Sequence, residues 1–360
     1  MTSPPVYSIN PIRDRRWTTF IDKDPRASVF HAPEWLEALR RTYRYEPVGL
    51  TTAGPGQDLD NGIVLCRVKS WLTGSRMVSL PFSDHCQPLV SGREELQHLM
   101  RGLERETDSG TWAYVEIRPV GLPESHRTAL EQAQTFCFHR LDLSRRTEDI
   151  FHGFHKDCVQ RKIRRAEREA LSYEVGSSEL LLQQFYRLLV VTRRRQRMPP
   201  QPMAWFRNLI ACMGDAVKIR VASKDGRAVA SILTLRHKKT MTYKYGGSDK
   251  RFANLGGMQL LLWRSIEEAK FHGLSEFDMG RSDLTNDGLI TFKDRWGAGR
   301  SELIYLQYRR VRQTRPTTLL ARVAKQVASL APDALVGAAG KVLYRHLACA
   351  ILFLLYQLRT

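Results

Sequence analysis

Apolar and polar positions along the first part of the chain predict both helices and strands. Pro33 is a favoured first residue of a helix, and Trp35, Leu36 and Leu39 fall on one helix face. Runs rich in β-branched and aromatic residues are typical of strands. The predicted elements are a helix over residues 32–43, strands over residues 62–69 and 112–118, a helix over residues 93–106 between them, and a last strand over residues 136–143.

The second part of the chain predicts a longer succession of elements. Met198-Pro199-Pro200 ends a helix, and Asp225-Gly226 is a typical hairpin turn between two strands. The expected order is a charged segment over residues 150–169, a helix over residues 178–194, strands over residues 217–223, 227–235 and 240–245, a helix over residues 258–272, a strand over residues 275–279, and a closing helix and strand over residues 292–296 and 301–308. This pattern predicts a mixed α/β (α+β) protein.

The length of the chain, 360 residues, exceeds one ordinary core and fits two domains with a tail. Hydrophobic residues make up 42% and charged residues 26% of the sequence, values typical of a folded globular protein. We expect an N-terminal domain over residues 1–149, a second domain over residues 150–310, and a helical tail over residues 311–360.

The net charge changes this picture, because 56 Lys and Arg against 37 Asp and Glu give a formal charge of +19. A positive surface field attracts phosphates and other anions. The partner it indicates is a nucleotide cofactor, a tRNA, a sugar-diphosphate precursor or an anionic membrane face, and composition does not choose among them. The alternative is that the basic balance only aids solubility.

The cysteines predict neither a zinc site nor a disulfide framework, because no two of them form a C-x-x-C pair. They are Cys66, Cys86, Cys137, Cys158, Cys212 and Cys349. His152, His155 and Cys158 recur at three-residue spacing, but a metal site there would need a helical turn and a fourth ligand from elsewhere. We therefore expect reduced cysteines and no bound metal.

The two ends of the chain bear on its location. Residues 1–10 lack the apolar core of a secretory signal, so we expect a cytoplasmic protein. The apolar run over residues 347–358 is shorter than the roughly 20 residues of a membrane-spanning helix. Lys341, Arg345 and Arg359 bracket it, which favours a surface-lying amphipathic helix in peripheral contact with the inner membrane, or a helix docked on the protein itself.

Four groups of motifs occur in a fixed order along the chain. They are Phe-His-Ala-Pro-Glu-Trp-Leu at residues 30–36, Ser-Leu-Pro-Phe-Ser-Asp at residues 79–84, Tyr-Lys-Tyr-Gly-Gly-Ser-Asp at residues 243–249, and Phe-Asp-Met-Gly-Arg at residues 277–281 with Phe-Lys-Asp-Arg-Trp-Gly at residues 292–297. Together they resemble the FemAB-like branch of the GNAT superfamily of acyltransferases, over roughly residues 15–310.

This resemblance implies two tandem GNAT-type domains and the transfer of an acyl or aminoacyl group to an amine. It implies acyl-CoA or aminoacyl-tRNA as co-substrate, without a permanently bound cofactor. The acceptor it implies is an amine on a cell-envelope or exopolysaccharide precursor. The implied chemistry is direct attack by the amine, with both substrates positioned by the enzyme and the oxyanion stabilised.

The donor site predicted by the resemblance lies around a glycine-rich turn. In acetyl-CoA-dependent GNAT enzymes such a turn binds the pyrophosphate at a helix start, and Arg251, Asn254, Gly256 and Gly257 resemble a degenerate form of it. The alternative is a plain turn and helix start. In the preceding strand, which holds Tyr243 and Tyr245, the small residues of the Tyr243–Gly247 segment would let a ligand approach the backbone. Both tyrosines are candidate substrate contacts.

Three further residues are candidates for the transfer chemistry. Asp278, at a strand end, could orient an amine or act as a base, or it could simply bond a neighbouring loop. Arg281 follows a glycine and is expected to bind an anionic substrate group. Lys293 lies between Phe292 and Trp296; the resemblance places it facing the transfer site, and the alternative is a solvated surface lysine.

Two basic clusters and one acidic loop residue complete the candidates. The first cluster is Lys156, Arg161, Lys162, Arg164, Arg165 and Arg168, of which four arginines would share a face if the segment is helical; the second is Arg193, Arg194, Arg195 and Arg197. We expect the second cluster to lie in a loop, with Arg195 and Arg197 binding substrate. Asp84 would line an acceptor pocket or cap backbone amides, while its neighbour His85 would point the other way.

Several other enzyme classes have no residue-level support. The sequence holds no Ser-His-Asp order, P-loop or dinucleotide fingerprint, which leaves a hydrolase, an NTPase or a dehydrogenase without a motif. The sequence therefore predicts an N-acyltransferase. The alternative is a FemAB-like scaffold or binding protein that has lost catalysis and serves polysaccharide assembly.

Overall fold

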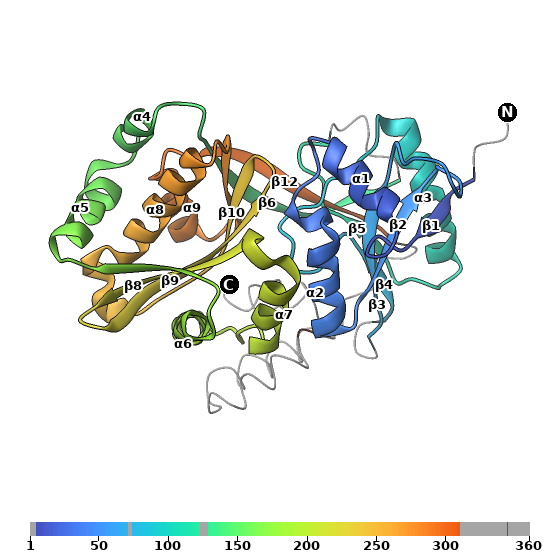
Figure 1. The fold of residues 1–360 in the computed structure, drawn as a ribbon. Coiled ribbons are helices and arrows are strands. Elements are labelled where there is room, and N and C mark those ends of the chain that lie inside the picture. Colours follow the sequence, from blue (N-terminus) through green and yellow to red (C-terminus); the bar gives the residue numbers. More distant parts are fainter. Residues whose placement is uncertain (1–4, 71–73, 123–128, 310–343, 345–360) are drawn as a thin grey trace. The chain divides into compact units, whose positions relative to one another are not determined.

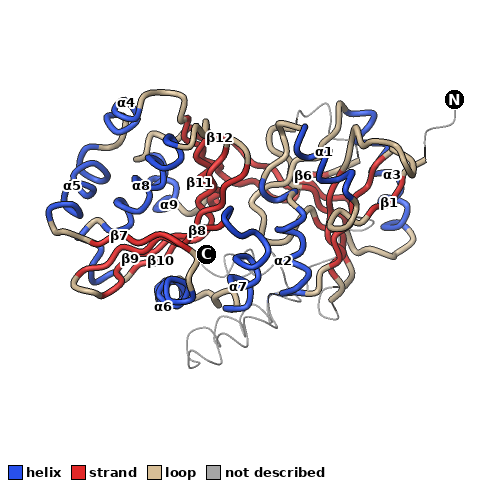
Figure 2. The backbone as a smooth tube through the Cα atoms, viewed as in Figure 1, coloured by secondary structure: helices blue, strands red, loops and turns tan. Residues whose placement is uncertain are grey.

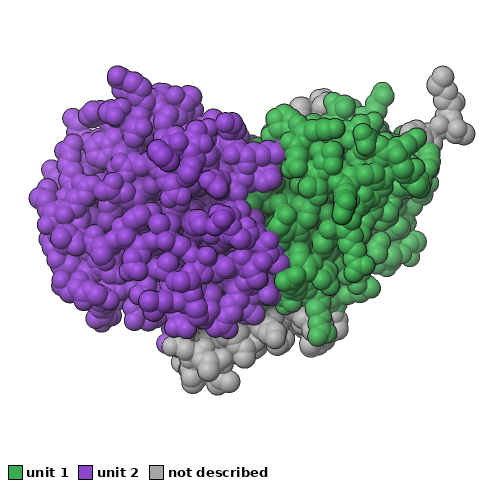
Figure 3. Space-filling view, in the orientation of Figure 1, with its two compact units in different colours: residues 1–135, 303–324, 339–360 green, residues 136–302, 325–338 purple. Residues whose placement is uncertain are grey.

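The computed structural model describes residues 5–70, 74–122, 129–309 and 344. These residues form two compact units, coloured separately in Figure 3. Among the described residues, unit 1 comprises residues 5–135, 303–309 and 344, and unit 2 comprises residues 136–302. Within the described ranges the chain leaves unit 1 after residue 135 and returns to it at residue 303, whereas the sequence analysis placed the boundary between the first two domains at residues 149 and 150.

The C-terminal tail expected from residue 311 lies outside the described residues, apart from Tyr344. The apolar run over residues 347–358 is part of it, so peripheral membrane contact through that run stays a prediction. No helix within the described ranges is both long and apolar enough to cross a bilayer.

Unit 1 is built around one sheet and three α-helices among its described residues. Its elements are β1 (Tyr7–Ile9), α1 (Arg15–Lys23), the 3-10 turn η1 (Val29–His31), α2 (Pro33–Tyr43), β2 (Glu46–Thr51), β3 (Ile63–Val68), β4 (Arg76–Val78), α3 (Arg93–Asp108), β5 (Val115–Ile117) and β12 (Gly299–Tyr308). The strand order in this unit is β1-β2-β3-β4-β5-β12. Strand β12, which follows unit 2 in the sequence, pairs antiparallel with β5 through Leu306 and Ile117.

The core of unit 1 lies between this sheet and helix α3. Leu96, Leu99 and Leu103 recur on one face of α3 and are buried against strand residues such as Leu65 and Ile117. Burial of this apolar stripe stabilises the helix, since a helix of this length is marginal by itself in water.

Unit 2 consists of hydrogen-bonded strands with helices on both faces (Figures 1 and 2). Its elements are β6 (Glu131–Asp142), α4 (Thr147–His152), the π turn η3 (Lys156–Gln160), α5 (Arg161–Arg168), β7 (Ser172–Gly176), α6 (Glu179–Arg195), α7 (Met203–Met213), the 3-10 turn η4 (Gly214–Ala216), β8 (Val217–Lys224), β9 (Arg227–His237), β10 (Thr240–Ser248), the 3-10 turn η5 (Lys250–Leu255), α8 (Gly257–Phe271), β11 (Glu276–Asp283) and α9 (Asp287–Asp294). The strand order is β6-β11-β10-β9-β8-β7.

The helices of unit 2 separate into two layers. Helices α4, α5, α8 and α9 lie on one side of the sheet, and α6 and α7 lie on the other (Figure 1). Leu261 and Ile266 of α8 are fully buried in the core of the first layer, together with Ile163 of α5. The strand predicted over residues 136–143 is confirmed as β6, but from residue 136 it belongs to unit 2 and does not close the first unit.

Helix α6 approaches strand β10 closely over Gly247. A Cβ atom added at Gly247 would lie 2.6 Å from the backbone of Leu188 and Leu189 in α6. At the neighbouring Gly246 the same atom would collide with the hydroxyl of Tyr243. The small residues of this strand therefore make room for the protein's own helix and tyrosine, whereas the sequence analysis expected them to admit a ligand.

We expect the substitution Gly247→Ala to lower the free energy of unfolding by about 1–3 kcal/mol, the usual cost of overpacking. The backbone of α6 must move, because no flexible side chain can yield there. Chemical denaturation of the full chain measures the change. Gly288→Ala is the control, since its Cβ would come no closer than 4.0 Å to its nearest neighbour. Equal stability of the two variants would contradict the packing described.

Candidate functional site

Strands β10 and β11 are parallel neighbours that separate part of the way along their length. Their pairing covers Thr240–Thr242 and Glu276–Asp278. Beyond it, β10 continues against β9 as far as Ser248, and β11 continues against β6 as far as Asp283. Both strands shift register at this point, β10 between Tyr243 and Tyr245 and β11 between Asp278 and Arg281. The facing edges of the two strands are thus freed from each other where bulges redirect their side chains.

The bulge in β11 is held by two buried side chains that the sequence analysis singled out. Asp278 accepts a 2.6 Å hydrogen bond from the amide of Gly280, whose φ of 70° suits glycine. The ammonium of Lys293 donates to the carbonyls of Gly280 and Arg281 at 2.8 and 2.9 Å. Lys293 is only 3% exposed, so it is not a solvated surface lysine. Both residues fix the backbone at the point where the strands separate.

Arg281 lies beside the same bulge with its guanidinium over an aromatic ring. Its Cζ atom is 4.0 Å from the ring centroid of Phe136 in β6. In the ladder between β11 and β6, Arg281 stands opposite Phe138, and the guanidinium of Arg140 lies over that second ring. The guanidinium of Arg281 is thereby held in a stacked orientation.

The two candidate tyrosines of β10 have different surroundings. The hydroxyl of Tyr245 accepts a 3.0 Å hydrogen bond from Trp205 of α7, and its ring meets Phe206 edge to face. Tyr243 packs against the core beneath α8, and burial raises its pKa to about 12. Its phenol stays protonated at neutral pH.

A cavity of about 200 Å³ lies at the start of α8. It is lined by Lys162, Val229, Ala230, Ser248, Asp249, Phe252, Ala253, Gly257, Met258, Gln259 and Phe292. Gly256 precedes the helix with a φ of 80°, and its carbonyl accepts the first helical bond, from Leu260. The amides of the first turn therefore begin at the cavity wall, where the helix dipole is positive.

Lys162 brings a positive charge to this cavity from the neighbouring helix α5. The side chain is half-buried, and among the described residues its ammonium has no hydrogen-bond or ion-pair partner. Its carbonyl approaches Gly256 so closely that a Cβ there would collide with it. Glycine at position 256 is thus required by both the positive φ and this contact.

The predicted residues Arg251 and Asn254 lie on the turn before α8. Arg251 binds Asp249 through its guanidinium at 2.6 Å, and this bond lowers the pKa of Asp249 to about 2. Arg227 lies 3.5 Å from the same carboxylate. Asn254 is exposed. The structure therefore brings Gly256, Gly257 and Lys162 to the cavity, while Arg251 neutralises the acid on its rim.

Three arginines of the first basic cluster have partners within the protein. Arg161 pairs with Asp157 at 2.9 Å, Arg165 lies 3.7 Å from Glu169, and Arg164 covers the ring of Phe151.

The second basic cluster is helical, contrary to the sequence analysis. Arg193, Arg194 and Arg195 form the last turn of α6, where cations stabilise the helix dipole. Arg195 donates to the carbonyl of Ser248 at 3.4 Å, and Arg197 is exposed in the residues after the helix.

The His-Cys spacing before α5 has a structural explanation. The Nδ1 atom of His155 accepts hydrogen bonds from the amides of Asp157 and Cys158 and so caps the following π turn. Within the described ranges no group of His, Cys, Asp and Glu is arranged to hold a metal ion.

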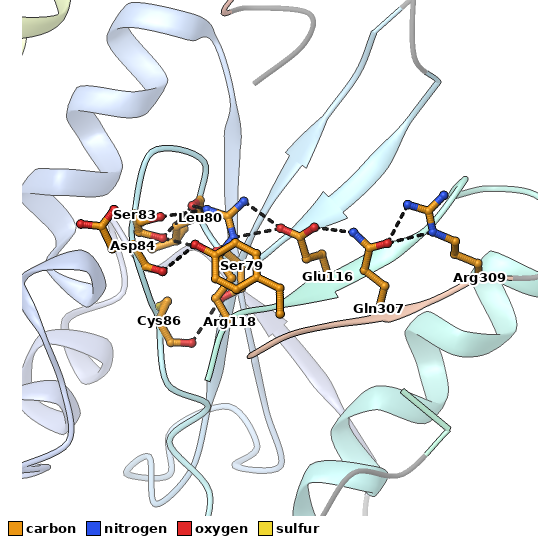
Figure 4. A network of polar contacts seen from close by, with 10 residues as sticks. Ser79, Leu80, Ser83, Asp84, Cys86, Glu116, Arg118, Gln307 and Arg309 are labelled. Atoms are coloured by element: carbon orange, nitrogen blue, oxygen red, sulfur yellow. Dashed lines mark hydrogen bonds and ion pairs between the residues drawn. The ribbon is translucent and has the colours of Figure 1, made fainter. Parts of the chain in front are cut away.

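In unit 1 the predicted acceptor loop is held by a buried arginine that the sequence analysis did not single out (Figure 4). Arg118 is fully buried and donates to the carbonyls of Leu80 and Ser83 at 2.8 and 2.9 Å. Its other edge binds Glu116, which in turn accepts from Gln307. The cation thus has a carboxylate partner and satisfies two loop carbonyls.

The loop that Arg118 holds has an unusual backbone. Leu80 and Phe82 adopt φ values of 51° and 65°, where bulky residues are strained. The carbonyl of Asp84 accepts a 2.6 Å hydrogen bond from Tyr305, whose ring lies under Arg118. Asp84 is half-buried in a loop fixed at both ends.

A histidine of β6 and an acid of α9 form a second polar cluster in unit 2. The Nε2 atom of His139 lies 3.1 Å from Asp294, which is also bound by Arg300. Burial lowers the pKa of His139, and the bond to Arg300 lowers the pKa of Asp294. Sequence reasoning missed this pair, because its members are 155 positions apart.

Comparison with known proteins finds a family that matches the part of the chain that holds these strands. Residues 155–293 match the family described as the acetyltransferase (GNAT) domain. This segment is similar to GNAT-type acetyltransferase domains. The matched span includes α8 and its cavity, the separated strands β10 and β11, and Lys293. The family resemblance seen in the sequence is confirmed.

Individual relatives extend the likeness along the chain. The UDP-N-acetylmuramoylpentapeptide-lysine N(6)-alanyltransferase of Weissella viridescens is 23% identical over 137 residues, which span 37% of this chain and only 40% of that enzyme. The crystal structure of FemX covers 87% of this chain and 98% of its own, with a TM-score of 0.65 and 14% identity. A tandem GNAT protein from the clavulanic acid biosynthesis pathway covers 86% and 99%, with a TM-score of 0.56 and 10% identity. These structures confirm a fold of two GNAT-type domains.

We expect Lys293→Met to lower the free energy of unfolding by roughly 2 kcal/mol or more, because two buried carbonyls in the GNAT domain lose their donor. Chemical denaturation measures the loss. Lys239→Met is the matched control, since Lys239 also donates to a carbonyl, that of Gly273, but is exposed. A loss no larger than that of the control would show that Lys293 does not hold the bulge.

The buried His139 predicts a pH dependence of stability. Its lowered pKa means that the unfolded chain binds this proton more readily than the folded chain. The contribution of neutral His139 to the free energy of unfolding is therefore fully present above the ordinary imidazole pKa of about 6.5. It decreases as the pH falls below that value. Denaturation at about pH 7.5 and about pH 5.5 should show a steeper loss for the native chain than for His139→Gln. Parallel losses would exclude this assignment.

Proposed function

We propose that this chain is an N-acyltransferase that moves an acyl group from acyl-CoA, or an aminoacyl group from a charged tRNA, to an amine of a cell-envelope or polysaccharide precursor. The observation that carries the proposal is the separation of β10 and β11 beside the start of α8. It offers unpaired strand edges for a donor chain and a helix start for its phosphates.

The donor's phosphates would bind at the cavity before α8. The first-turn amides and the ammonium of Lys162 supply the positive charge, and Gly256 and Gly257 keep the approach open. CoA and the end of a tRNA both present phosphates, so this site suits either donor.

The transfer itself would take place where the two strands separate. An amine attacks the donor's carbonyl carbon, and freed backbone amides at the bulges stabilise the oxyanion. We assign Lys293 and Asp278 to positioning, since both bind the backbone of the β11 bulge. Arg281 would bind an anionic group of the acceptor through the edge of its stacked guanidinium.

The acceptor class rests on charge and on the relatives. The net charge of +19 suits an anionic precursor. The matched alanyltransferase is named for a UDP-N-acetylmuramoylpentapeptide-lysine, a nucleotide-linked precursor with an amine. In unit 1, Asp84 stays a candidate substrate contact in the loop that Arg118 holds.

Thermal unfolding of the purified chain with acetyl-CoA and longer acyl-CoAs tests the donor site. A ligand that binds the folded state raises the melting temperature, and at a hundredfold excess over Kd it stabilises by about 2.7 kcal/mol. We expect Lys162→Ala to weaken acetyl-CoA binding at least about tenfold, because one charge-assisted contact is lost. The matched control is Lys156→Ala, an exposed lysine of the same basic segment that does not line the cavity.

The same titration distinguishes the donors. Stabilisation by acyl-CoA that is lost in Lys162→Ala and kept in Lys156→Ala supports the CoA thioester. Stabilisation by charged tRNA alone, weakening steeply with salt, supports the aminoacyl donor. Absence of stabilisation by either class contradicts the proposed function.

A further inference from the structure

A cavity in unit 1 lies between helix α3 and the β1 end of the sheet; we call it the α3 cavity. Its volume is about 530 Å³, within the roughly 300–1,000 Å³ of small-molecule sites. Residues of β1, β2 and α3 line it, so it lies wholly within unit 1. It shares no residue with the donor cavity at the start of α8.

A glycine in the middle of α3 keeps this cavity open. Gly102 is an interior residue of the helix and lines the cavity, and a Cβ atom added there would meet no other atom within 4 Å. Its backbone lies outside the left-handed region. Apart from proline, glycine is the weakest helix former. Neither backbone geometry nor packing among the described residues therefore requires glycine here, and its effect is to leave space.

The floor of the α3 cavity is apolar. Leu50 of β2 and Leu103 of α3 line it and belong to the core of unit 1. Val6, next to β1, is half-buried and packs against the same core. A hydrocarbon group beside Gly102 would extend this core and be removed from water, which favours its binding.

The helix wall of the cavity carries positive charge. Arg101 and Arg105 are exposed, line the cavity and lie one turn apart on α3. Like charges at that spacing repel each other, so an anion beside them would stabilise the helix. Among the described residues the guanidinium of Arg105 has no hydrogen-bond or ion-pair partner. The acid on the same wall, Glu106, already accepts a 2.5 Å hydrogen bond from the indole of Trp112.

The strand wall adds a hydrogen-bond donor. Ser8 of β1 lines the cavity and is exposed, and within the described ranges its hydroxyl has no hydrogen-bond partner. Val6 lies two positions before it, and residues two apart in an extended chain share a face. The apolar floor is thus flanked by a hydroxyl on one wall and guanidinium groups on the other.

We propose that the α3 cavity binds a small amphipathic anion, a hydrocarbon chain that ends in a carboxylate or a phosphate. The chain lies on Val6, Leu50 and Leu103, in the space that Gly102 leaves. The anionic head binds the guanidinium of Arg105, which suits both carboxylate and phosphate oxygens. The site is independent of the proposed donor site, because every residue that forms it belongs to unit 1.

Isothermal titration calorimetry of the full chain with octanoate and with octyl phosphate tests the site and distinguishes the two heads. We expect at least one of them to bind with one site per chain. Octyltrimethylammonium carries the same hydrocarbon chain with a positive head, and inorganic phosphate carries the head alone. Each should bind at least about tenfold more weakly, since one lacks the charge-assisted bond and the other lacks the apolar contact.

Two variants locate the site without relying on a damaged fold. Gly102→Leu should abolish binding and leave the melting temperature equal or higher, because leucine has room there and is the better helix former. Arg105→Gln should weaken binding at least about tenfold. Arg93→Gln is the matched control and should bind as the native chain does, since Arg93 is an exposed arginine of the same helix that does not line the cavity.

Three outcomes would overturn the proposal. Equal binding of octanoate and octyltrimethylammonium would show an apolar surface without selection for anions. Binding that is unchanged in Gly102→Leu would place the anion elsewhere on the chain. Absence of binding to the native chain, together with a lower melting temperature of Gly102→Leu, would show that the space is filled by the chain itself, for instance by the residues before Pro5. None of these results depends on acyl-CoA, so the proposed function is tested separately.

Discussion

The separation of two parallel strands is the constraint on which the site of unit 2 depends, and it is held by a buried ammonium. Parallel strands normally remain paired along their length, so an unpaired stretch must be fixed by something other than the ladder. Lys293 supplies two donors to the carbonyls of the β11 bulge, and Asp278 accepts from the amide within it. Because these bonds come from α9 and from the strand itself, the site is shaped before any substrate arrives.

A buried cation has the same task in each unit. Lys293 binds the carbonyls of a bulged strand, and Arg118 binds the carbonyls of a loop whose Leu80 and Phe82 have positive φ. Burial of a charge is tolerated only where hydrogen bonds replace its hydration. Arg118 binds a carboxylate as well as two loop carbonyls, and Lys293 donates to two carbonyls of the bulge. Irregular backbone that would otherwise relax is thereby kept in one conformation.

Sequence patterns predicted the long helices and central strands because their apolar periodicity is strong, as in α2, α3, α6 and α8. Short edge elements such as β1, and the return of β12 to unit 1, depend on pairing with distant residues and leave little local signal. The motif around Gly256 indicated the helix start, but the partner of that helix, Lys162, belonged to a cluster of six basic residues that looked alike in the sequence. Burial of Lys293 and the contact between His139 and Asp294 arise only from tertiary packing.

The return of the chain to unit 1 has a consequence for synthesis. Among the described residues, unit 2 is continuous from residue 136 to residue 302, whereas the strands of unit 1 lack β12 until the chain beyond residue 302 has been made. Gln307 and Tyr305, which complete the contacts around Glu116 and Arg118, also come from β12. During synthesis, unit 2 can therefore finish folding before unit 1. Until β12 has been made, strand β5 of unit 1 lacks its partner, and its exposed edge is open to pairing with a wrong strand.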